Sequence, residues 1–315
     1  MKKKSNIAFS KTINIKRKNP NIGKNIFCEL DNLHIFFCEG LILLKNVRNE
    51  LKISYFNKKN TLFSYIDETV YLGNYTKKKI YAHNISLTKQ HKKNSNQFDY
   101  FHNIIKKENL YKSFFSDLRS FLTDLSLKDS TIAGIGKSLI NWKIENKYCP
   151  KCGEKFKKNY NFKWESTCSI CKKIYFPRID PVIIVLVING NKTILGRSYH
   201  FPEKVYSCLA GFVEPGETLE MTALREIKEE VGIDIIDIKF VTNQPWPFPS
   251  SLMFGLIARA KNKKMKIDKK EIENAFWISK KNLKRILDGK NDNIFAARKG
   301  TIARYLLEKW VNNKI

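Results

Sequence analysis

Long apolar runs and acidic side chains are both scarce in this sequence. The longest uninterrupted apolar run, residues 182–188, has seven residues, whereas a membrane-spanning helix needs about 20. The basic first residues are not followed by an apolar stretch of the kind that marks a secretory signal. We therefore expect a protein that has no membrane partner and lies in the cytoplasm.

Acidic residues number 30, against 58 lysines and arginines, which gives a formal net charge of +28. Such an excess attracts polyanions in a salt-dependent way. The lysines are nevertheless spread along the whole chain and form no single basic segment, which is typical of a solvated surface. The charge alone therefore does not predict a dedicated nucleic-acid-binding face.

The length of 315 residues exceeds that of one ordinary domain, so we expect roughly two or three. Near the start, short apolar pieces separated by polar turns predict a small antiparallel β-sheet; these pieces are residues 33–38, 41–44, 53–56, 70–72 and 80–82. Helical spacing of apolar residues then predicts two helices, at 110–122 and 132–142.

Four of the seven cysteines form two CxxC pairs. Cys149 and Cys152 are separated from Cys168 and Cys171 by 15 residues. Paired cysteines in a chain without a secretory signal favour a metal over disulfides, and four thiolates make a closed zinc site with no open position for catalysis. We predict a structural zinc ribbon. The other cysteines are expected to be buried apolar side chains: Cys28, Cys38 and Cys208.

A helix is predicted over residues 219–231, because apolar residues recur there at helical intervals. Pro215-Gly216 makes a turn before it, and Gly232 supplies a left-handed stop after it. Further strands are expected at 181–188, 193–197, 205–209 and 234–242, with a last helix near 301–311. These elements predict a mixed sheet sandwiched between helices.

Three glutamates lie on one flank of the 219–231 helix: Glu226, Glu229 and Glu230. Their charges would repel one another, and a divalent cation such as Mg²⁺ or Mn²⁺ relieves the repulsion while leaving room for a substrate phosphate. The alternative is a solvated helix face on which Arg225 pairs with the acids. The complete spacing of glycine turn, Arg-Glu pair and Glu-Glu pair from Gly211 onward favours the metal site.

A proline-rich loop with two large aromatic residues is predicted after the 234–242 strand. The prolines make it stiff, so its rings would lose little entropy on stacking against a flat base or nicotinamide. A loop that only covers the core is the alternative. The loop consists of Gln244, Pro245, Trp246, Pro247, Phe248, Pro249, Ser250 and Ser251.

Together, the four-cysteine ribbon, the spacing from Gly211 to Ile233 and the QPWPFPSS loop resemble the NADH pyrophosphatase family of Nudix hydrolases, which also remove NAD caps from RNA. The resemblance implies an α+β protein whose Nudix α/β/α sandwich spans residues 178–315. A zinc ribbon over 145–177 and a β-rich N-terminal domain over 1–144 would precede it. It also implies a homodimer.

The resemblance further implies the roles of individual residues. Glu226, Glu229, Glu230 and the later Glu271 would be catalytic. The metal ligands would be Glu226, Glu230, Glu271 and the carbonyl of Ala210 for Mg²⁺ or Mn²⁺, and Cys149, Cys152, Cys168 and Cys171 for Zn²⁺. Residues 244–251, Phe176 and Ala303 would bind substrate. Two departures from the family are Asn243 in place of a serine and Phe176 in place of a tyrosine.

The expected reaction is hydrolysis of the pyrophosphate bond of NADH or NAD to the nicotinamide mononucleotide and AMP, with removal of NAD caps from RNA. The general base is left open between Glu229 and Glu271. One alternative is a Nudix hydrolase of another substrate such as ADP-ribose or a dinucleoside polyphosphate. Another is a zinc-ribbon nucleic-acid-binding protein.

Overall fold

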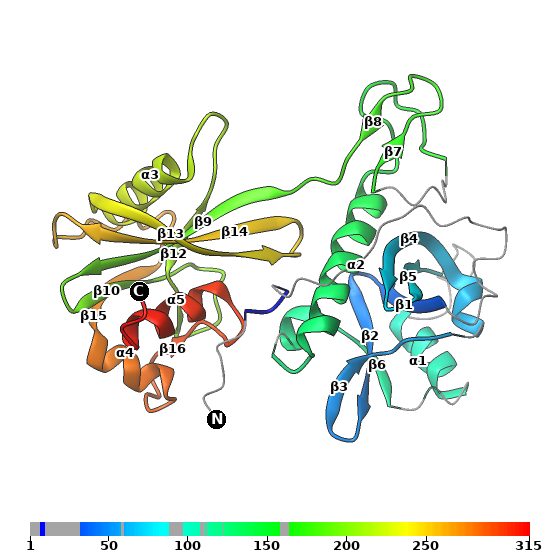
Figure 1. The fold of residues 1–315 in the computed structure, drawn as a ribbon, viewed down its shortest axis with the longest axis horizontal. Helices are drawn as coiled ribbons and strands as arrows, with labels where there is room; N and C mark the ends of the chain where they lie inside the picture. Colours follow the sequence, from blue (N-terminus) through cyan, green and yellow to red (C-terminus); the bar gives the residue numbers. More distant parts are fainter. Residues whose placement is uncertain are drawn as a thin grey trace. The chain divides into compact units, whose positions relative to one another are not determined.

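The chain forms two compact units in the computed structural model (Figure 1). The first unit comprises Lys11–Arg178 with Pro247–Pro249, and the second comprises Met1–Ser10, Ile179–Trp246 and Ser250–Ile315. The structure describes residues 7–9, 32–57, 60–87, 97–107, 110, 112–121, 123–157 and 164–315. Cys28 lies outside these residues.

The second unit is built on a six-stranded mixed sheet of order β13-β14-β9-β10-β15, with β12 pairing β9. Strand β14 runs parallel to β9, and the other pairs in this sheet are antiparallel. A separate short pair, β11 and β16, is parallel. The elements are β9 (Asp180–Asn189), β10 (Lys192–Arg197), β11 (Val205–Tyr206), β12 (Leu209–Phe212), α3 (Leu219–Val231), β13 (Ile235–Trp246), β14 (Ser251–Ala260), β15 (Asn274–Ser279), α4 (Lys280–Leu287), β16 (Phe295–Ala296) and α5 (Ile302–Val311).

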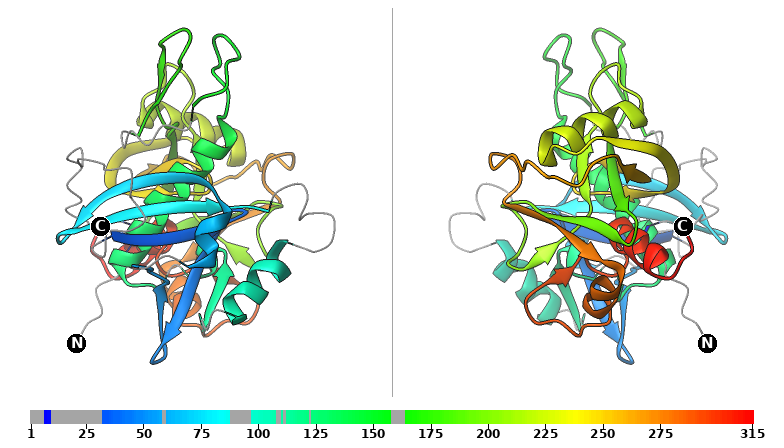
Figure 2. Two further views of the ribbon diagram at one scale, coloured as in Figure 1. Left: turned by 90° about the vertical axis from the view of Figure 1, so that its right-hand side faces the viewer. Right: turned by 90° about the vertical axis from the view of Figure 1, so that its left-hand side faces the viewer.

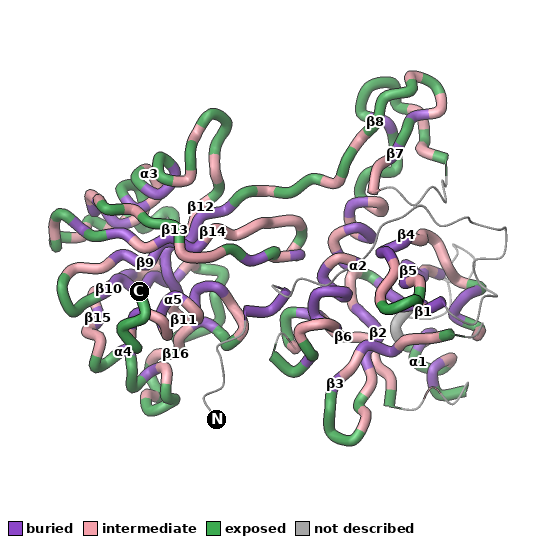
Figure 3. The backbone as a smooth tube through the Cα atoms, viewed as in Figure 1, coloured by how far each residue is buried: buried purple, intermediate pink, exposed green. Residues whose placement is uncertain are grey.

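Helices cover both faces of this sheet, as Figures 1 and 2 show. Successive side chains of a strand point to opposite faces, and β9 follows this rule. Ile183 and Val185 pack in the core beneath α3, whereas Ile184 and Leu186 pack in the core shared with α4 and α5. The burial of β9 is visible in Figure 3. The predicted mixed sheet between helices is confirmed, with α3 at the predicted bounds.

The first unit holds a second six-stranded sheet, of order β3-β2-β1-β5-β4, in which β6 also pairs β2. The ribbon strands β7 and β8 form a separate antiparallel pair. The elements are β1 (Asn32–Cys38), β2 (Leu41–Val47), β3 (Glu50–Ile53), η1 (Thr61–Tyr65), β4 (Ile66–Tyr75), β5 (Lys78–Ile85), α1 (Gln97–Lys107), β6 (Ser113–Ser116), η3 (Leu118–Phe121), α2 (Leu127–Glu145), β7 (Ser166–Thr167) and β8 (Ile174–Tyr175).

Two sequence predictions for the first unit are wrong. The sheet is mixed rather than antiparallel, because β1 and β5 pair in parallel. The apolar spacing at 110–122 does not mark a helix: Phe114 lies on β6, and Leu118 begins the short 3₁₀ helix η3. Sheet pairing satisfies the backbone of this segment, which the apolar spacing alone could not indicate. The helix predicted at 132–142 is present as part of α2.

In the described part of the chain, no helix is long and apolar enough to cross a membrane. Two of the three cysteines outside the CxxC pairs, Cys38 and Cys208, are buried as predicted. Burial raises the pKa of the Cys208 thiol to about 12, so this group is neutral.

A buried pair of histidines lies in the sheet of the first unit. His34 Nδ1 is 2.8 Å from His83 Nε2, and His83 Nδ1 is 2.9 Å from Thr69 Oγ1. Burial lowers the pKa of His34 to about 4, and burial followed by the charge of His34 lowers that of His83 well below its ordinary value. Both rings are therefore neutral at pH 7.

This pair predicts acid sensitivity of the first unit. The folded pKa values lie below the unfolded value of 6.5, so the unfolded chain takes up protons first as the pH falls. The stabilisation is complete above pH 6.5 and is lost toward about pH 4; at 1.36 kcal/mol per pKa unit, His34 contributes roughly 3 kcal/mol. Denaturant midpoints measured across this range should fall less steeply for His34→Gln than for the parent. Equal slopes would contradict the assignment.

Candidate active site

Helix α3 holds the predicted acidic residues in place through its two ends. Thr218 Oγ1 accepts a hydrogen bond from the Met221 amide at 3.2 Å, which caps the N-terminus. Gly232 ends the helix in the left-handed conformation, with φ of 69°. The buried stripe of Ala223, Ile227 and Val231 faces the core. The glutamates are therefore held on the flank of a rigid helix.

Strand β12 passes directly beside this flank. A Cβ atom on Gly211 would lie 1.9 Å from Glu226 Cδ, so only glycine leaves room for the glutamate side chain. Ala210 precedes it in the same strand, half-buried. The glycine required by the sequence pattern is thus a position where strand β12 closely approaches the Glu226 side chain.

Arg225 links the turn before α3 to the glutamates on the helix. Its Nε lies 2.7 Å from Glu217 Oε1, and its Nη1 lies 2.9 Å from Glu226 Oε1 and 3.1 Å from Glu229 Oε2. Its Nη2 also donates to the carbonyl of Phe212 at 3.0 Å. The Arg225 hydrogen bond, with the Glu214 amide, lowers the pKa of Glu217 to about 2. Glu217 is therefore a charged partner of Arg225.

Glu230 has a different environment from Glu217. Its pKa is raised to about 8, first by burial and then by the charges of Glu226, Glu271 and Glu229. The pKa of Glu226 is raised as well, chiefly by burial, although Arg225 opposes that shift. We call Glu226, Glu229, Glu230 and Glu271 the acidic cluster.

Glu271 reaches the cluster from a segment far along the chain. The Lys266 amide donates to the Val231 carbonyl at 2.9 Å, and the Asp268 amide donates to the Glu230 carbonyl at 3.0 Å. These bonds tie the segment to the C-terminal end of α3. The Glu271 amide then donates to the Asp268 carbonyl at 3.2 Å in a turn. The predicted distant glutamate is therefore close enough to raise the pKa of two helix glutamates.

The donors of the acidic cluster fit a divalent cation. Oε2 of Glu230 is buried and has no hydrogen-bond partner in the described part of the chain, which is costly unless a counter-charge satisfies it. Carboxylate oxygens are what Mg²⁺ and Mn²⁺ prefer. Among the described residues, no three carboxylates lie as close together as the four cysteines do. A bound cation would therefore draw these side chains inward.

The four predicted zinc ligands come together in the first unit. Their sulfur atoms all lie within 4.8 Å of one another, with 3.6 Å between Cys149 and Cys171 and 3.5 Å between Cys152 and Cys168. Zn–S bonds of about 2.3 Å in a tetrahedron require S–S separations of about 3.8 Å. The cluster therefore fits a zinc ribbon.

The predicted substrate loop is a hairpin at an edge of the sheet. Pro245 and Trp246 end β13 and pair with Leu252 and Ser251 of β14, which is allowed because β13 is an edge strand. Ser250 Oγ donates to Asp180 Oδ2 at 2.8 Å. The sequence predicts a loop over all of residues 244–251, but residues 244–246 and 251 are strand.

Gln244 is fully buried, and its side chain joins three segments of the second unit. Nε2 donates to the Ala8 carbonyl at 3.0 Å and to the Gly300 carbonyl at 2.8 Å, while Oε1 accepts from the Ile302 amide at 2.7 Å. Ala303, in the first turn of α5, is also buried. The structure thus brings Gln244 and Ala303, two predicted substrate residues, together around the start of α5. The side-chain amide of Gln244 is hydrogen-bonded within the protein.

The remaining predicted substrate residues are distributed over both units. Phe248, with Pro247 and Pro249, groups with the first unit, where the Arg119 guanidinium lies 4.6 Å from the centre of its ring. Phe176 is 66% exposed in the same unit. Trp246 is half-buried in the second unit.

One residue beside the acidic cluster was missed by the sequence analysis. Phe212 follows Gly211 directly and is 60% exposed, although it belongs to a sheet strand. Arg225 fixes its backbone through the carbonyl. A large apolar ring held in solvent beside carboxylates is a candidate stacking surface. In the sequence, its position between Gly211 and the Pro215-Gly216 turn could have identified it.

Comparison with known proteins adds to this geometry. Residues 178–298 match the NUDIX domain family, and residues 32–142 match the NADH pyrophosphatase-like rudimentary NUDIX domain. The chain is 36% identical over 200 residues to NAD-capped RNA hydrolase NUDT12 of Homo sapiens, covering 60% of this chain and 43% of that protein. It is 34% identical over 200 residues to NAD-capped RNA hydrolase NudC of Pseudomonas putida, covering 63% of this chain and 68% of that protein. The chain therefore spans less than half the length of the human relative.

The close approach at Gly211 leads to a prediction about metal binding. In Gly211→Ala the new Cβ should displace Glu226, and misplacing a ligand typically weakens metal affinity by about 10- to 100-fold. Calorimetric titration with Mn²⁺ measures this effect. Gly289→Ala is the control for a general loss of stability, because its φ of 72° strains the backbone while its Cβ meets no atom within 4 Å. Equal Mn²⁺ affinities for the two variants would contradict the role of Glu226.

Proposed function

This chain belongs to the NUDIX family, and we therefore propose that it hydrolyses the pyrophosphate bond of NADH or NAD, releasing the nicotinamide mononucleotide and AMP. The same reaction on an NAD-capped RNA would leave a 5′-monophosphate on the RNA. The human and Pseudomonas putida relatives are both named NAD-capped RNA hydrolases, which supports this substrate class. The NADH pyrophosphatase-like domain in the first unit supports it as well.

The observation that carries the proposal is the environment of Glu230. A carboxyl group with a buried, unpartnered oxygen and a pKa of about 8 stands among three other glutamates. Burial and the neighbouring carboxylates make ionisation of Glu230 less favourable, and Arg225 opposes this effect at Glu226 but not at Glu230. The arrangement suits a site that binds divalent cations, which in turn bind the negative charge of a substrate diphosphate.

The residues of the acidic cluster would have different roles in hydrolysis. Divalent ions, for which we propose Mg²⁺ or Mn²⁺, would neutralise the phosphate charge and make a bound water more acidic. Glu226 and Glu230, with Glu271 and the Ala210 carbonyl, would hold them. Arg225 keeps Glu226 oriented through its 2.9 Å bond.

We propose Glu271 as the general base. Glu229 already accepts a hydrogen bond from Arg225 at 3.1 Å, whereas Glu271 forms no ion pair in the described part of the chain. It lies on a turn, exposed to solvent, so it can both take a proton from water and release it.

We propose that substrate rings stack on the half-buried side chain of Trp246 and on the exposed ring of Phe212. We also propose that residues 244–251, Phe176 and Ala303 contact the substrate. Zn²⁺ is the proposed ion of the four cysteines. We also propose the division into residues 1–144, 145–177 and 178–315, a cytoplasmic location and a homodimer.

Glu230→Gln tests the proposed chemistry. The substitution keeps the shape of the side chain but removes its charge, and loss of several kcal/mol of charge stabilisation corresponds to a fall in kcat of about 100-fold or more. Release of AMP from NADH in the presence of Mg²⁺ or Mn²⁺ measures it. Glu220→Gln is the matched control, because Glu220 is exposed in the first turn of the same helix. Near-normal turnover by Glu230→Gln, or no turnover by the parent protein, would overturn the proposal.

Trp246→Ala tests the binding of the second ring. Stacking on an aromatic side chain contributes about 1–3 kcal/mol per base, so the KM for NADH should rise about 10-fold. The KM for ADP-ribose, which lacks the nicotinamide, should change little, and Trp246→Phe should retain most of the affinity. An equal rise for both substrates would mean that the residue only supports the hairpin.

A further inference from the structure

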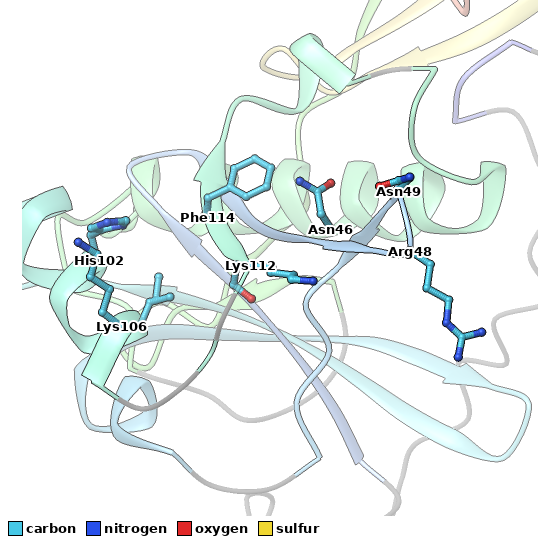
Figure 4. Close-up of a pocket in the computed structure, with 9 residues that line it drawn as sticks. Asn46, Arg48, Asn49, His102, Lys106, Lys112 and Phe114 are labelled. Carbon is cyan, nitrogen blue, oxygen red and sulfur yellow. The ribbon is translucent and has the colours of Figure 1, made fainter.

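The first unit contains a broad hollow of about 870 Å³. It lies between the turn that joins β2 to β3, the exposed side of α1, and the start of β6 (Figure 4). Figure 4 shows side chains from all three elements around this space. The residues that matter for its chemistry are Asn46, Arg48, His102, Lys106, Lys112 and Phe114. We call this feature the basic hollow.

The charge of the basic hollow is of one sign. Arg48, Lys106 and Lys112 are exposed, and they form no ion pair in the described part of the chain. No carboxylate is among the described residues that line it. The acidic residue of the adjoining turn, Glu50, pairs with Lys52 at 2.8 Å. The three cations are therefore not offset by a carboxylate among the described lining residues, and such a surface attracts anions.

The backbone beneath these cations is rigid. Arg48 and Asn49 have φ values of 51° and 63° in the tight turn between β2 and β3. The Asn46 amide donates to the Lys112 carbonyl at 3.1 Å, which ties the turn to the segment before β6. Strands β2 and β6 then pair in register, with Leu44 opposite Phe114. The spacing between Arg48 and Lys112 is thus set by the sheet, and Lys106 is added by α1.

The hollow also offers an aromatic ring and amide groups. Phe114 is half-buried, and its ring packs edge-on against Phe121 with 6.1 Å between ring centres. The exposed side chains of Asn46 and Asn49 can both donate and accept hydrogen bonds. Cations along a groove together with a ring for stacking are the combination that binds single-stranded nucleic acid. A helix that binds a membrane surface presents an apolar face to it, whereas the apolar residues Phe101 and Ile105 of α1 are buried in the core of the first unit.

We propose that the basic hollow binds the phosphates and bases of a single-stranded RNA. The inference rests on the proposed function for its biological sense, because an NAD-capped substrate carries an RNA body beyond the dinucleotide. The physical binding does not depend on it. Arg48, Lys106 and Lys112 would contact phosphates, while Phe114 and the asparagine amides would contact bases.

Binding is tested with the full chain, without divalent ions, and with a fluorescent uncapped RNA of about 12 nucleotides. Anisotropy is measured between about 50 and 200 mM salt. Lys106→Gln/Lys112→Gln removes two cations from the hollow. The matched control is Lys77→Gln/Lys78→Gln, which removes two exposed cations at the hairpin of β4 and β5, on the opposite edge of the same sheet.

The hollow variant should bind RNA about tenfold more weakly, and its salt slope should fall by roughly 1.4, since each phosphate contact on a single strand contributes about 0.7. The control should stay within about twofold of the parent. Phe114→Leu should weaken binding without changing the slope. Circular dichroism melts check that each variant is folded.

Equal losses in the hollow and control variants would overturn the proposal in favour of diffuse charge, and no loss in either would remove the site. Competition by AMP as strong as that by RNA would reduce it to a mononucleotide site. Binding to phosphatidylserine vesicles but not to RNA would also overturn it. NADH turnover should be unchanged in the hollow variant; a parent that binds RNA here but cleaves no NADH would refute the proposed function and leave this inference standing.

Discussion

Repulsion between closely placed carboxylates is the constraint on which the second unit depends. Three glutamates on one flank of α3 and Glu271 on a distant turn lie near one another, and the most buried of them, Glu230, has a pKa of about 8 because of that burial and its neighbours. The surrounding structure brings these groups together rather than apart. The glycine of β12 leaves room for Glu226, and the segment around Asp268 is hydrogen-bonded to the end of the helix. Because the fold holds these carboxylates together despite their repulsion, a divalent cation that binds there would relieve that repulsion.

Arg225 divides the glutamates of the site into two kinds. Its bidentate contact with Glu217 keeps that carboxylate ionised and joins the turn to the helix. Its single contact with Glu226 opposes, but does not cancel, the effect of burial. Glu230 receives no such contact. Residues of one type on one short segment therefore differ in chemistry because a single guanidinium reaches some of them and not others.

Local patterns predicted the parts of this protein that local interactions determine. Helix α3 has the predicted bounds because Thr218 caps its start and Gly232 ends it, and the CxxC pairs gave the four-sulfur cluster. The parallel pairing of β1 with β5 and the strand at Phe114 were not predictable, since apolar spacing does not specify which backbone a segment will pair with. The engagement of Gln244 with Ala8 joins residues that are 236 positions apart, and no local pattern encodes such a contact.

The two units differ in whether a helix with clustered glutamates packs against the sheet. The long helix of the first unit, α2, has no paired glutamates. Its buried acid, Asp129, accepts a hydrogen bond from the Tyr55 hydroxyl at 2.9 Å and lies 3.4 Å from the Ile53 amide. That carboxylate stabilises the fold and is not available to a metal. The proposal for the basic hollow gives this unit a different role, in which Arg48, Lys106 and Lys112 bind the phosphates of the substrate. Its rudimentary character is therefore compatible with a role in recognition.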